Sequence, residues 1–275
     1  MSAWLTKTNK LRTTSILNIK TESPTVKTFT FKDKLCAKAK PGQFLMLWIP
    51  GVDEIPLSIS DLNGKEGTVS VAVKRVGEAT KALHGKKVGD TIGVRGPFGN
   101  SFSLGHGRIL MVGGGIGIAP LLFLAKKLSF SKAAKMVLAV GAKTRKELLF
   151  LDKLKGICGE TNVLAATEDG SYGVKALASE LVEDILAEEK FDMVYACGPE
   201  QMLLKVFNFC EKHHVSMEAS LERLMRCAIG ICGSCIIGKY RVCRDGPIFN
   251  TSQLRSVKDE FGVWKRDFDG RKIPS

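Results

Sequence analysis

Four cysteines in the last quarter of the chain constrain its fold more than any other feature. They follow the spacing C-x4-C-x2-C-x7-C, at Cys227, Cys232, Cys235 and Cys243. The first three reproduce a spacing used for [2Fe–2S] clusters. Because four thiolates must converge on two irons, an irregular loop has to supply the first three ligands. The sequence therefore predicts a [2Fe–2S] cluster in an electron-carrying chain.

The residues between these cysteines suit a cluster loop. They are small or apolar, and Gly230 and Gly233 can adopt backbone conformations that other residues resist. Backbone N–H groups of such a loop can hydrogen-bond to cluster sulfur. The alternatives are a zinc site or a pair of disulfides. Zinc usually takes its cysteines as two separated pairs, whereas three crowd into one loop here, which favours the cluster.

Length and cysteine usage predict a cytoplasmic chain of more than one domain. The 275 residues exceed the usual single-domain length. The N-terminus has no apolar signal core, and the remaining cysteines show no disulfide-like rhythm: Cys36, Cys158, Cys197 and Cys210. The uncharged run 109–125 is about one residue short of a membrane span and contains glycines and a proline. We expect a strand, a turn and a helix there, and no membrane contact.

The formal net charge of +13 does not indicate a nucleic-acid-binding protein. The basic residues are dispersed among acidic ones, and only three Tyr and three Trp could stack on bases. Bound phosphate-bearing ligands would themselves neutralise part of the positive charge. We therefore expect no nucleic-acid partner.

Up to about residue 105, the sequence has the pattern of β-structure. Val69, Val71 and Val73 alternate with Ser, Ala and Lys, and residues 44–49 form a short apolar run. Gly, Pro and Asn-Gly turn signals separate these segments. Several short strands at such spacing predict an antiparallel barrel or sandwich.

From about residue 106 to 216, buried strands alternate with helices. The expected strands are Ile109–Val112, Met136–Val140, Asn162–Ala166 and Asp192–Ala196. The expected helices lie near Ala119–Leu128, Val174–Glu188 and Glu200–Glu211. This order predicts a parallel sheet covered on both faces. The last stretch, 217–275, is rich in Gly, Cys and Arg, and its one expected helix before the cysteines is Glu218–Met225.

Two turns of the α/β segment suit a dinucleotide. One, between a strand and a helix, contains Gly113, Gly114, Gly115 and Gly117; the other, after the last strand, is Cys197-Gly198-Pro199. Glycines let the backbone approach a pyrophosphate, and helix N-terminal amides supply positive potential. A tight packing turn is the plain alternative for the first motif. No acidic residue follows the 136–140 strand, where it could bind the ribose 2′-hydroxyl of NAD, so the sequence does not distinguish NAD from NADP.

The order of these motifs resembles the ferredoxin-reductase superfamily. It comprises Pro56-Leu57-Ser58, a Gly-Pro-Phe-Gly segment at 96–99, the glycine turn and Cys197-Gly198-Pro199. The tail is similar to the electron-transfer subunits of the NAD-dependent, two-subunit dihydroorotate dehydrogenase. That likeness rests on the Glu222–Cys227 segment and on Cys243-Arg244-Asp245-Gly246-Pro247. The resemblance covers nearly the whole chain and is most specific at the cysteine loop.

This resemblance implies three domains and two further cofactors. Residues 1–105 would form an FAD-binding β-barrel, 106–216 an NAD(H)-binding α/β domain and 217–275 the [2Fe–2S] domain. The residues implied to hold FAD are Ile55, Pro56, Leu57, Ser58, Ala72, Val73, Lys74, Ala79 and Thr80. Relatives commonly carry Arg just before the proline, where it can pair with the diphosphate, whereas this chain has Glu54-Ile55. Lys74, Arg75 or a helix terminus would then have to compensate.

The implied function is electron transfer in pyrimidine (UMP) biosynthesis. An FMN-containing dihydroorotate dehydrogenase catalytic subunit would oxidise dihydroorotate, and electrons would pass through the [2Fe–2S] cluster and FAD to NAD(+), in a heterotetramer with two copies of each chain. This chain has no evident orotate site or catalytic base of its own. Two alternatives remain: a γ-type diaphorase subunit of a sulfhydrogenase or sulfite reductase, and a non-catalytic [2Fe–2S] redox sensor.

Overall fold

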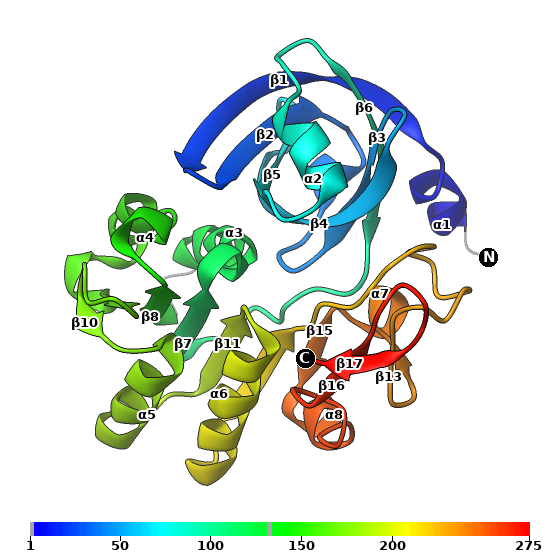
Figure 1. Cartoon of the computed structure of the whole chain (residues 1–275). Helices are drawn as coiled ribbons and strands as arrows, with labels where there is room; N and C mark the ends of the chain where they lie inside the picture. Colours follow the sequence, from blue (N-terminus) through cyan, green and yellow to red (C-terminus); the bar gives the residue numbers. More distant parts are fainter. Residues whose placement is uncertain (1–2, 131–133) are drawn as a thin grey trace.

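The computed structural model describes residues 3–130 and 134–275 and arranges them as a barrel, a sheet with helices and a cysteine-rich tail (Figure 1). After a short helix, α1 (Ala3–Thr8), six antiparallel strands close the barrel in the order β1-β2-β5-β4-β3-β6. They are β1 (Arg12–Ser23), β2 (Val26–Lys32), β3 (Phe44–Ile49), β4 (Asp53–Asn63), β5 (Thr68–Lys74) and β6 (Thr91–Phe98). The predicted β-segment is therefore confirmed, as a barrel.

Pairing of β1 with both β2 and β6 closes this barrel, with Arg12 opposite Val94. Alternate residues point inward, so that Phe29, Leu47 and Val71 are fully buried in one core. Two short helical segments lie between strands, η1 (Cys36–Lys38) and α2 (Glu78–His84).

The second part of the chain forms a sheet with the strand order β10-β9-β8-β7-β11-β12-β15. Its strands are β7 (Gly107–Gly114), β8 (Ala134–Ala142), β9 (Val163–Thr167), β10 (Val174–Lys175), β11 (Met193–Cys197), β12 (Ser216–Ser220) and β15 (Ile248–Asn250). All neighbours run parallel except β12 and β15. The strand order reverses between β7 and β11, where open α/β sheets form a ligand-binding crevice at the carboxyl ends of the strands.

Helices cover both faces of this sheet, as the sequence predicted. The helical segments here are η2 (Gly115–Gly117), α3 (Ile118–Ser129), η3 (Arg145–Glu147), α4 (Leu151–Cys158), η4 (Glu160–Asn162), α5 (Ala178–Glu188) and α6 (Glu200–Lys212). Leu110 and Val112 of β7 join the core under α5 and α6, whereas Ile109 and Met111 join the core under α3 and α4. The uncharged run 109–125 is thus strand, turn and helix. None of the described helices is long and apolar enough to cross a membrane.

Two expected helices differ in the structure. The helix expected over Val174–Glu188 starts only at Ala178, because the first residues pair with β9 as strand β10. The helix expected over Glu218–Met225 is wrong, since the segment begins inside β12, which runs parallel to β11. In β12, Met217 and Ala219 are buried. Pairing with the free edge of β11, together with this burial, outweighs the local helix propensity.

The cysteine-rich tail leaves the sheet after β12 and returns to it at β15. Between these strands lie β13 (Ile236–Ile237), β14 (Tyr240–Arg241) and α7 (Val242–Asp245). Beyond β15 come α8 (Thr251–Arg255) and a hairpin of β16 (Trp264–Arg266) and β17 (Lys272–Pro274). The cysteine loop therefore connects two neighbouring strands at the edge of the sheet and lies below the barrel (Figure 1).

Helix α3 joins the barrel to the sheet. Its Phe123 side chain is 2% exposed and belongs to the core of the barrel. Beside it, Lys126 of α3 forms an ion pair with Asp61 of β4, with 2.5 Å between Nζ and Oδ2. The barrel and the sheet consequently share buried surface and are not connected by a flexible linker alone.

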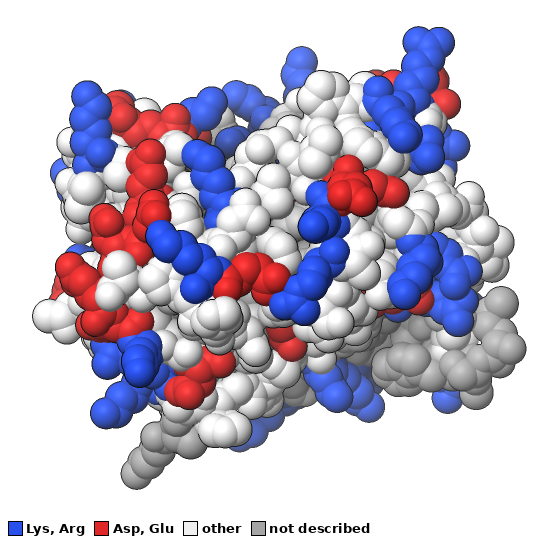
Figure 2. Space-filling view, turned by 90° about the horizontal axis from the view of Figure 1, so that it is seen from below, with Lys and Arg blue, Asp and Glu red and all other residues white. Residues whose placement is uncertain are grey.

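Figure 2 shows one face of the molecule, on which Lys and Arg side chains lie among Asp and Glu side chains. On this face the basic residues do not gather into a stripe, as expected from the sequence.

We expect Tyr195→Phe to lower the free energy of unfolding by about 1–3 kcal/mol, because several hydrogen bonds to a buried hydroxyl are lost. The fully buried Tyr195 hydroxyl donates to the Ser103 carbonyl at 2.8 Å and accepts from the Gly105 N–H at 3.0 Å. These bonds hold the connection between barrel and sheet against β11. Urea unfolding of the two proteins measures the difference.

The matched control is Tyr172→Phe. The Tyr172 hydroxyl meets Lys155 Nζ at 3.4 Å and is partly exposed, so its loss should change stability by less than about 0.5 kcal/mol. Equal effects of the two substitutions would show that the Tyr195 hydrogen bonds contribute nothing specific.

Candidate nucleotide and cluster sites

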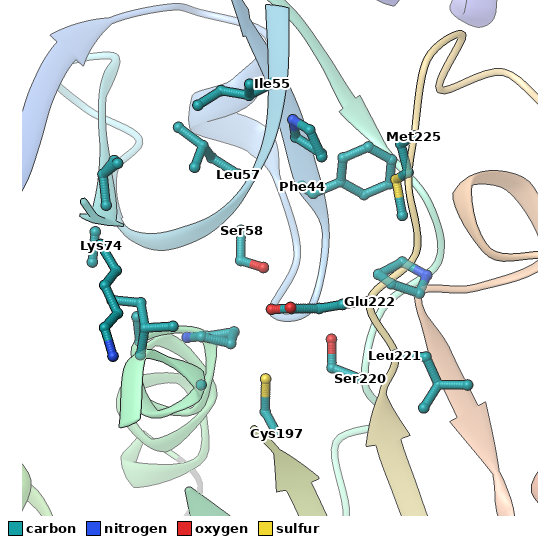
Figure 3. Close-up of a pocket in the computed structure, with 18 of the residues that line it drawn as sticks. Phe44, Ile55, Leu57, Ser58, Lys74, Cys197, Ser220, Leu221, Glu222 and Met225 are labelled. Atoms are coloured by element: carbon teal, nitrogen blue, oxygen red, sulfur yellow. The ribbon is translucent and has the colours of Figure 1, made fainter. Parts of the chain in front are cut away.

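A cavity of about 360 Å³ lies between the barrel and the carboxyl ends of the sheet strands (Figure 3). From the barrel it is lined by most of the residues implied to hold FAD: Ile55, Pro56, Leu57, Ser58, Ala72, Val73, Lys74 and Thr80. The remaining predicted residue, Ala79, packs against the barrel core instead. The barrel side of the predicted flavin site is thus brought together in one place, and its assignment to FAD stays a prediction.

The opposite wall of this cavity comes from the sheet and the cysteine-rich tail. It contains Gly117, Cys197, Ser220, Leu221, Glu222, Met225 and Pro247. In Figure 3 the Ser58 and Ser220 hydroxyls and the Glu222 carboxyl point toward one another across the cavity, with the Cys197 thiol below them. The sequence analysis missed Glu222, although it quoted the segment that begins with this residue as part of the family likeness.

Glu222 is the acidic group of this cavity among the lining residues that the structure describes. Desolvation by the protein atoms packed around it raises the pKa of its carboxyl above the ordinary value of 4.5, although the side chain remains open to the cavity; Lys265 opposes the rise and Glu200 adds to it. Glu222 therefore holds a proton more strongly than a fully hydrated glutamate does. A carboxyl of this kind can accept or release a proton beside a bound ligand.

Lys74 is the cation best placed for a phosphate in this cavity. The other lining cation, Arg223, is 8% exposed and forms a two-point ion pair with Glu200, with 2.8 Å between Nη2 and Oε1. Lys74 lies 3.8 Å from the Glu147 carboxylate, a looser contact. It is thus freer than Arg223 to approach a diphosphate.

The Glu54-Ile55 departure from the family pattern has a structural explanation. Glu54 does not line the cavity; it pairs with Arg95 of β6 through two hydrogen bonds of 2.8 and 2.6 Å. Ile55 occupies the position before Pro56 and adds apolar surface to the cavity wall. Neither residue brings a positive charge to the cavity wall.

Thr80 fixes the turn at the start of α2. Its hydroxyl accepts from the Val76 and Gly77 N–H groups, each at 2.9 Å, and donates to the Gly77 carbonyl at 3.0 Å. The hydroxyl is thus already engaged within the turn. Thr80 thereby shapes the backbone that borders the cavity.

A second cavity of about 290 Å³ lies on the other side of the glycine turn. Of the residues predicted to bind the dinucleotide, Gly114, Gly115 and Pro199 line it. Glu168, which belongs to a segment that resembles a family loop near the nicotinamide, also lines it. The sequence did not indicate the other lining residues: Gly141, Ala142, Lys143, Glu147, residues 176–179, Gln201, Met202 and Lys205. Lys74 lines both cavities, so the two sites are neighbours.

The predicted glycines have two different tasks. Gly115 has φ +54° and open space where a side chain would start, so a ligand can approach its backbone. A Cβ at Gly117 would lie 2.3 Å from the Cys197 carbonyl oxygen, and one at Gly113 would lie 2.5 Å from Cδ1 of Ile118. At Gly113 and Gly117 the missing side chain allows close packing of the turn, which is the alternative to phosphate binding that the sequence left open. Gly198 likewise packs against the Gly114 backbone.

The four cysteines of the loop lie in two pairs. The Cys232 N–H lies 3.5 Å from Cys227 Sγ, and the Cys243 N–H lies 3.4 Å from Cys235 Sγ. In the described part of the chain, no three His, Cys, Asp or Glu side chains are grouped so that they could hold one metal ion. In a [2Fe–2S] cluster each iron takes two thiolates, and two thiol pairs on one loop fit that ligand requirement.

The loop backbone favours thiolates at two of these positions. Partial burial opposes ionisation of Cys227, yet the N–H groups of Cys232, Ile229 and Ile231 lower the pKa of its thiol to about 7. A hydrogen bond from Cys243 lowers the pKa of Cys235 to about 7 and raises the pKa of Cys243. Thiolates are the form that binds iron.

The cysteine pairs differ in exposure. Cys232 is exposed and the adjacent Ile231 is 70% exposed, whereas Cys235 and Cys243 are buried. The backbone has positive φ at Gly230 and Gly233, as expected from the sequence. The loop therefore presents one thiol pair toward the surface and the other toward the interior.

Comparisons with known proteins agree with this geometry. Residues 222–255 match the family described as the iron-sulfur cluster binding domain of dihydroorotate dehydrogenase B, and residues 111–206 match the oxidoreductase NAD-binding domain. Both matches fall on the segments that carry the thiol pairs and the glycine turn.

Similar proteins span nearly the whole chain. The probable electron transfer subunit of dihydroorotate dehydrogenase B (NAD(+)) from Methanocaldococcus jannaschii is 43% identical, covering 92% of this chain and 94% of that protein. Its namesake from Pyrococcus furiosus is 42% identical, covering 96% and 99%. A chain in the solved structure of an NADH-dependent reduced ferredoxin-NADP oxidoreductase superposes with a TM-score of 0.80 and 30% identity, covering 90% of this chain and 91% of that one. This chain belongs to the family of electron transfer subunits of NAD-dependent dihydroorotate dehydrogenase B.

Proposed function

We propose that this cytoplasmic chain carries electrons from a dihydroorotate-oxidising catalytic subunit to NAD(+). The cluster is a [2Fe–2S] centre on Cys227, Cys232, Cys235 and Cys243. The flavin is FAD in the larger cavity, and NAD(H) binds in the smaller one. In this assignment residues 1–105, 106–216 and 217–275 serve FAD, NAD(H) and the cluster, and the partner is an FMN-containing subunit in a heterotetramer with two copies of each chain.

One observation carries the proposal: the segments that bear the cysteines also form a wall of the larger cavity. Met225 lines the cavity two residues before Cys227, and Pro247 lines it four residues after Cys243. A ligand in that cavity is therefore separated from the cysteine loop by very few residues. This continuity supports electron exchange between a flavin and the cluster.

FAD fits the larger cavity because apolar walls, hydroxyls and Lys74, whose ion pair with Glu147 is loose, face each other there. When bound, a flavin supplies exchange of a hydride with nicotinamide and of single electrons with an iron–sulfur centre. Ile55, Leu57 and Phe44 would exclude water, and Lys74 would hold the diphosphate. The Glu222 carboxyl holds or releases the proton that accompanies the electrons.

The two alternatives from the sequence are less well supported. The relatives named above carry the dihydroorotate dehydrogenase name, which favours that partner over a sulfhydrogenase or a sulfite reductase. A redox sensor would have no use for a second cavity beside the glycine turn, yet this cavity is present and lined by Gly114, Gly115 and Pro199.

The function is tested on the anaerobically purified chain and its Cys243→Ser variant. We expect the unaltered chain to show flavin and [2Fe–2S] absorption that NADH bleaches, to reduce artificial acceptors with NADH, and to leave dihydroorotate unchanged. Cys243→Ser should lose iron and acid-labile sulfide but keep NADH oxidation, because the cavities remain. Iron and sulfide analysis together with diaphorase assays measure both.

Cys158→Ser is the matched control, since this partly exposed cysteine of α4 lies outside the loop and should leave the cluster intact. Zinc in place of iron, or dihydroorotate oxidation by the chain alone, would contradict the proposal.

We expect Lys74→Met to weaken FAD binding by about 10- to 100-fold, which is the effect of losing a charge-assisted hydrogen bond. The matched control is Arg75→Met, because Arg75 is exposed and does not line the cavity. Fluorescence titration of the flavin-free proteins with FAD measures both affinities. Equal losses in the two variants would mean that Lys74 has no direct contact with the flavin.

Stability should depend on pH through Glu222. Its folded-state pKa is raised, so its contribution to stability is fully present below the unfolded pKa and is lost as pH rises through the folded pKa. Glu222→Gln should therefore melt at a higher temperature than the unaltered flavin-free chain near pH 7, and the gap should shrink toward about pH 4. Thermal unfolding across this range measures the gap, and a gap that widens toward acid would contradict the raised pKa.

A further inference from the structure

The Gly-Pro-Phe-Gly segment continues into Asn100, which contacts the tail just after the fourth cysteine. The Asn100 N–H donates to the Gly246 carbonyl at 2.7 Å. The side-chain amide donates to the carbonyls of Asp245 at 3.3 Å and Ile248 at 2.8 Å. Its oxygen accepts from the Ile248 N–H at 2.9 Å. Asn100, two residues beyond the end of β6, therefore makes four hydrogen bonds to a segment that starts two residues beyond Cys243.

This contact adjoins residues that line the larger cavity. A Cβ at Gly99 would lie 2.5 Å from Pro247 Cδ and 3.1 Å from Phe44 Cε1. The Gly99 backbone therefore packs directly against the rings of Pro247 and Phe44. Phe44 and Pro247 both line the larger cavity. The Gly99 carbonyl accepts from Gln43 Nε2 at 2.8 Å, which fixes this segment to the start of β3.

The same strand also reaches the first cysteine. Arg95 of β6 donates to Asn9 Oδ1 at 2.5 Å and, more weakly, to the Cys227 carbonyl at 3.4 Å, while its other nitrogens hold Glu54. Strand β6 and the residues directly after it thus contact both ends of the cysteine set, through Arg95 at Cys227 and through Asn100 beyond Cys243. The Asn100 contact is the stronger, with four hydrogen bonds against one.

We propose that Asn100 is a positioning residue that holds the Cys243 segment against the flavin cavity and so sets the rate of electron transfer between flavin and cluster. The inference rests on the proposed route through FAD and a [2Fe–2S] cluster. Asn100 touches neither reacting group; it acts through the backbone of residues 245–248. Because Asn100 itself is exposed, its replacement does not open a core.

The substitutions Asn100→Asp and Asn100→Ala test this proposal. Aspartate keeps the shape but replaces the amide donor with a carboxylate oxygen facing the carbonyls of Asp245 and Ile248, and alanine removes all side-chain bonds. The control is Asn162→Ala, because Asn162 is also exposed and donates to a backbone carbonyl, that of Cys158, at 2.7 Å.

The measurement is stopped-flow absorption of the FAD- and cluster-loaded chain mixed with NADH. Each NADH loses a hydride, which equals two electrons and one proton; one electron reduces the single cluster of the chain, the other stays on the flavin until a second acceptor takes it, and the proton goes to Glu222 or to solvent. In both Asn100 variants we expect flavin reduction at the unaltered rate and cluster reduction slowed by about tenfold or more, as small misplacements do elsewhere. We also expect an altered EPR signal or midpoint potential of the cluster, which a general loss of stability would not produce.

Each outcome decides the inference. Loss of iron and sulfide from Asn100→Ala, with Asn162→Ala fully loaded, would also support it, because the Cys243 segment would then depend on Asn100. If the Asn100 variants contain the full cluster and show unaltered cluster reduction and an unaltered EPR signal, the positioning role of Asn100 is overturned while the proposed function stands. An unaltered chain whose cluster is not reduced by NADH would overturn the proposed function, and this inference with it.

Discussion

Two backbone turns meet at the centre of the sheet, and the arrangement of both cavities depends on that contact. Gly117 faces the Cys197 carbonyl so closely that any side chain would overlap it, and a Cβ at Gly198 would lie 3.0 Å from the Gly114 backbone. Because these turns pack without side chains between them, one cavity opens on each side. Lys74 can then border both. The relative placement of the two cavities is thereby set by backbone packing.

The cysteine-rich tail is held by the same sheet that carries the two turns. It leaves the sheet at β12 and re-enters it at β15, so both ends of the loop are anchored by strand pairing. The short stretches between these strands and the cysteines form the wall of the larger cavity. Anchoring at both ends explains how an irregular loop can keep thiol pairs at a fixed place beside the barrel.

Local patterns predicted much of this architecture. The alternation around Val71, the glycine turn and the cysteine spacing depend on neighbouring residues, and they indicated the barrel, the crevice and the thiol set. Strand β12 was missed because its conformation is decided by the free edge of β11, which is distant in sequence. For the same reason the sequence could not show that Glu54 meets Arg95, or that Glu222 faces Ser58 across the cavity.

The position of Phe123 limits how this chain can be divided. A ring from the helix that follows the glycine turn fills part of the interior of the barrel. Cutting the chain near residue 105 would leave the first piece with a hole in its core and the second with a bare aromatic ring on its surface. Exchange of flavin and nicotinamide modules between relatives would therefore have to carry this helix along with the barrel.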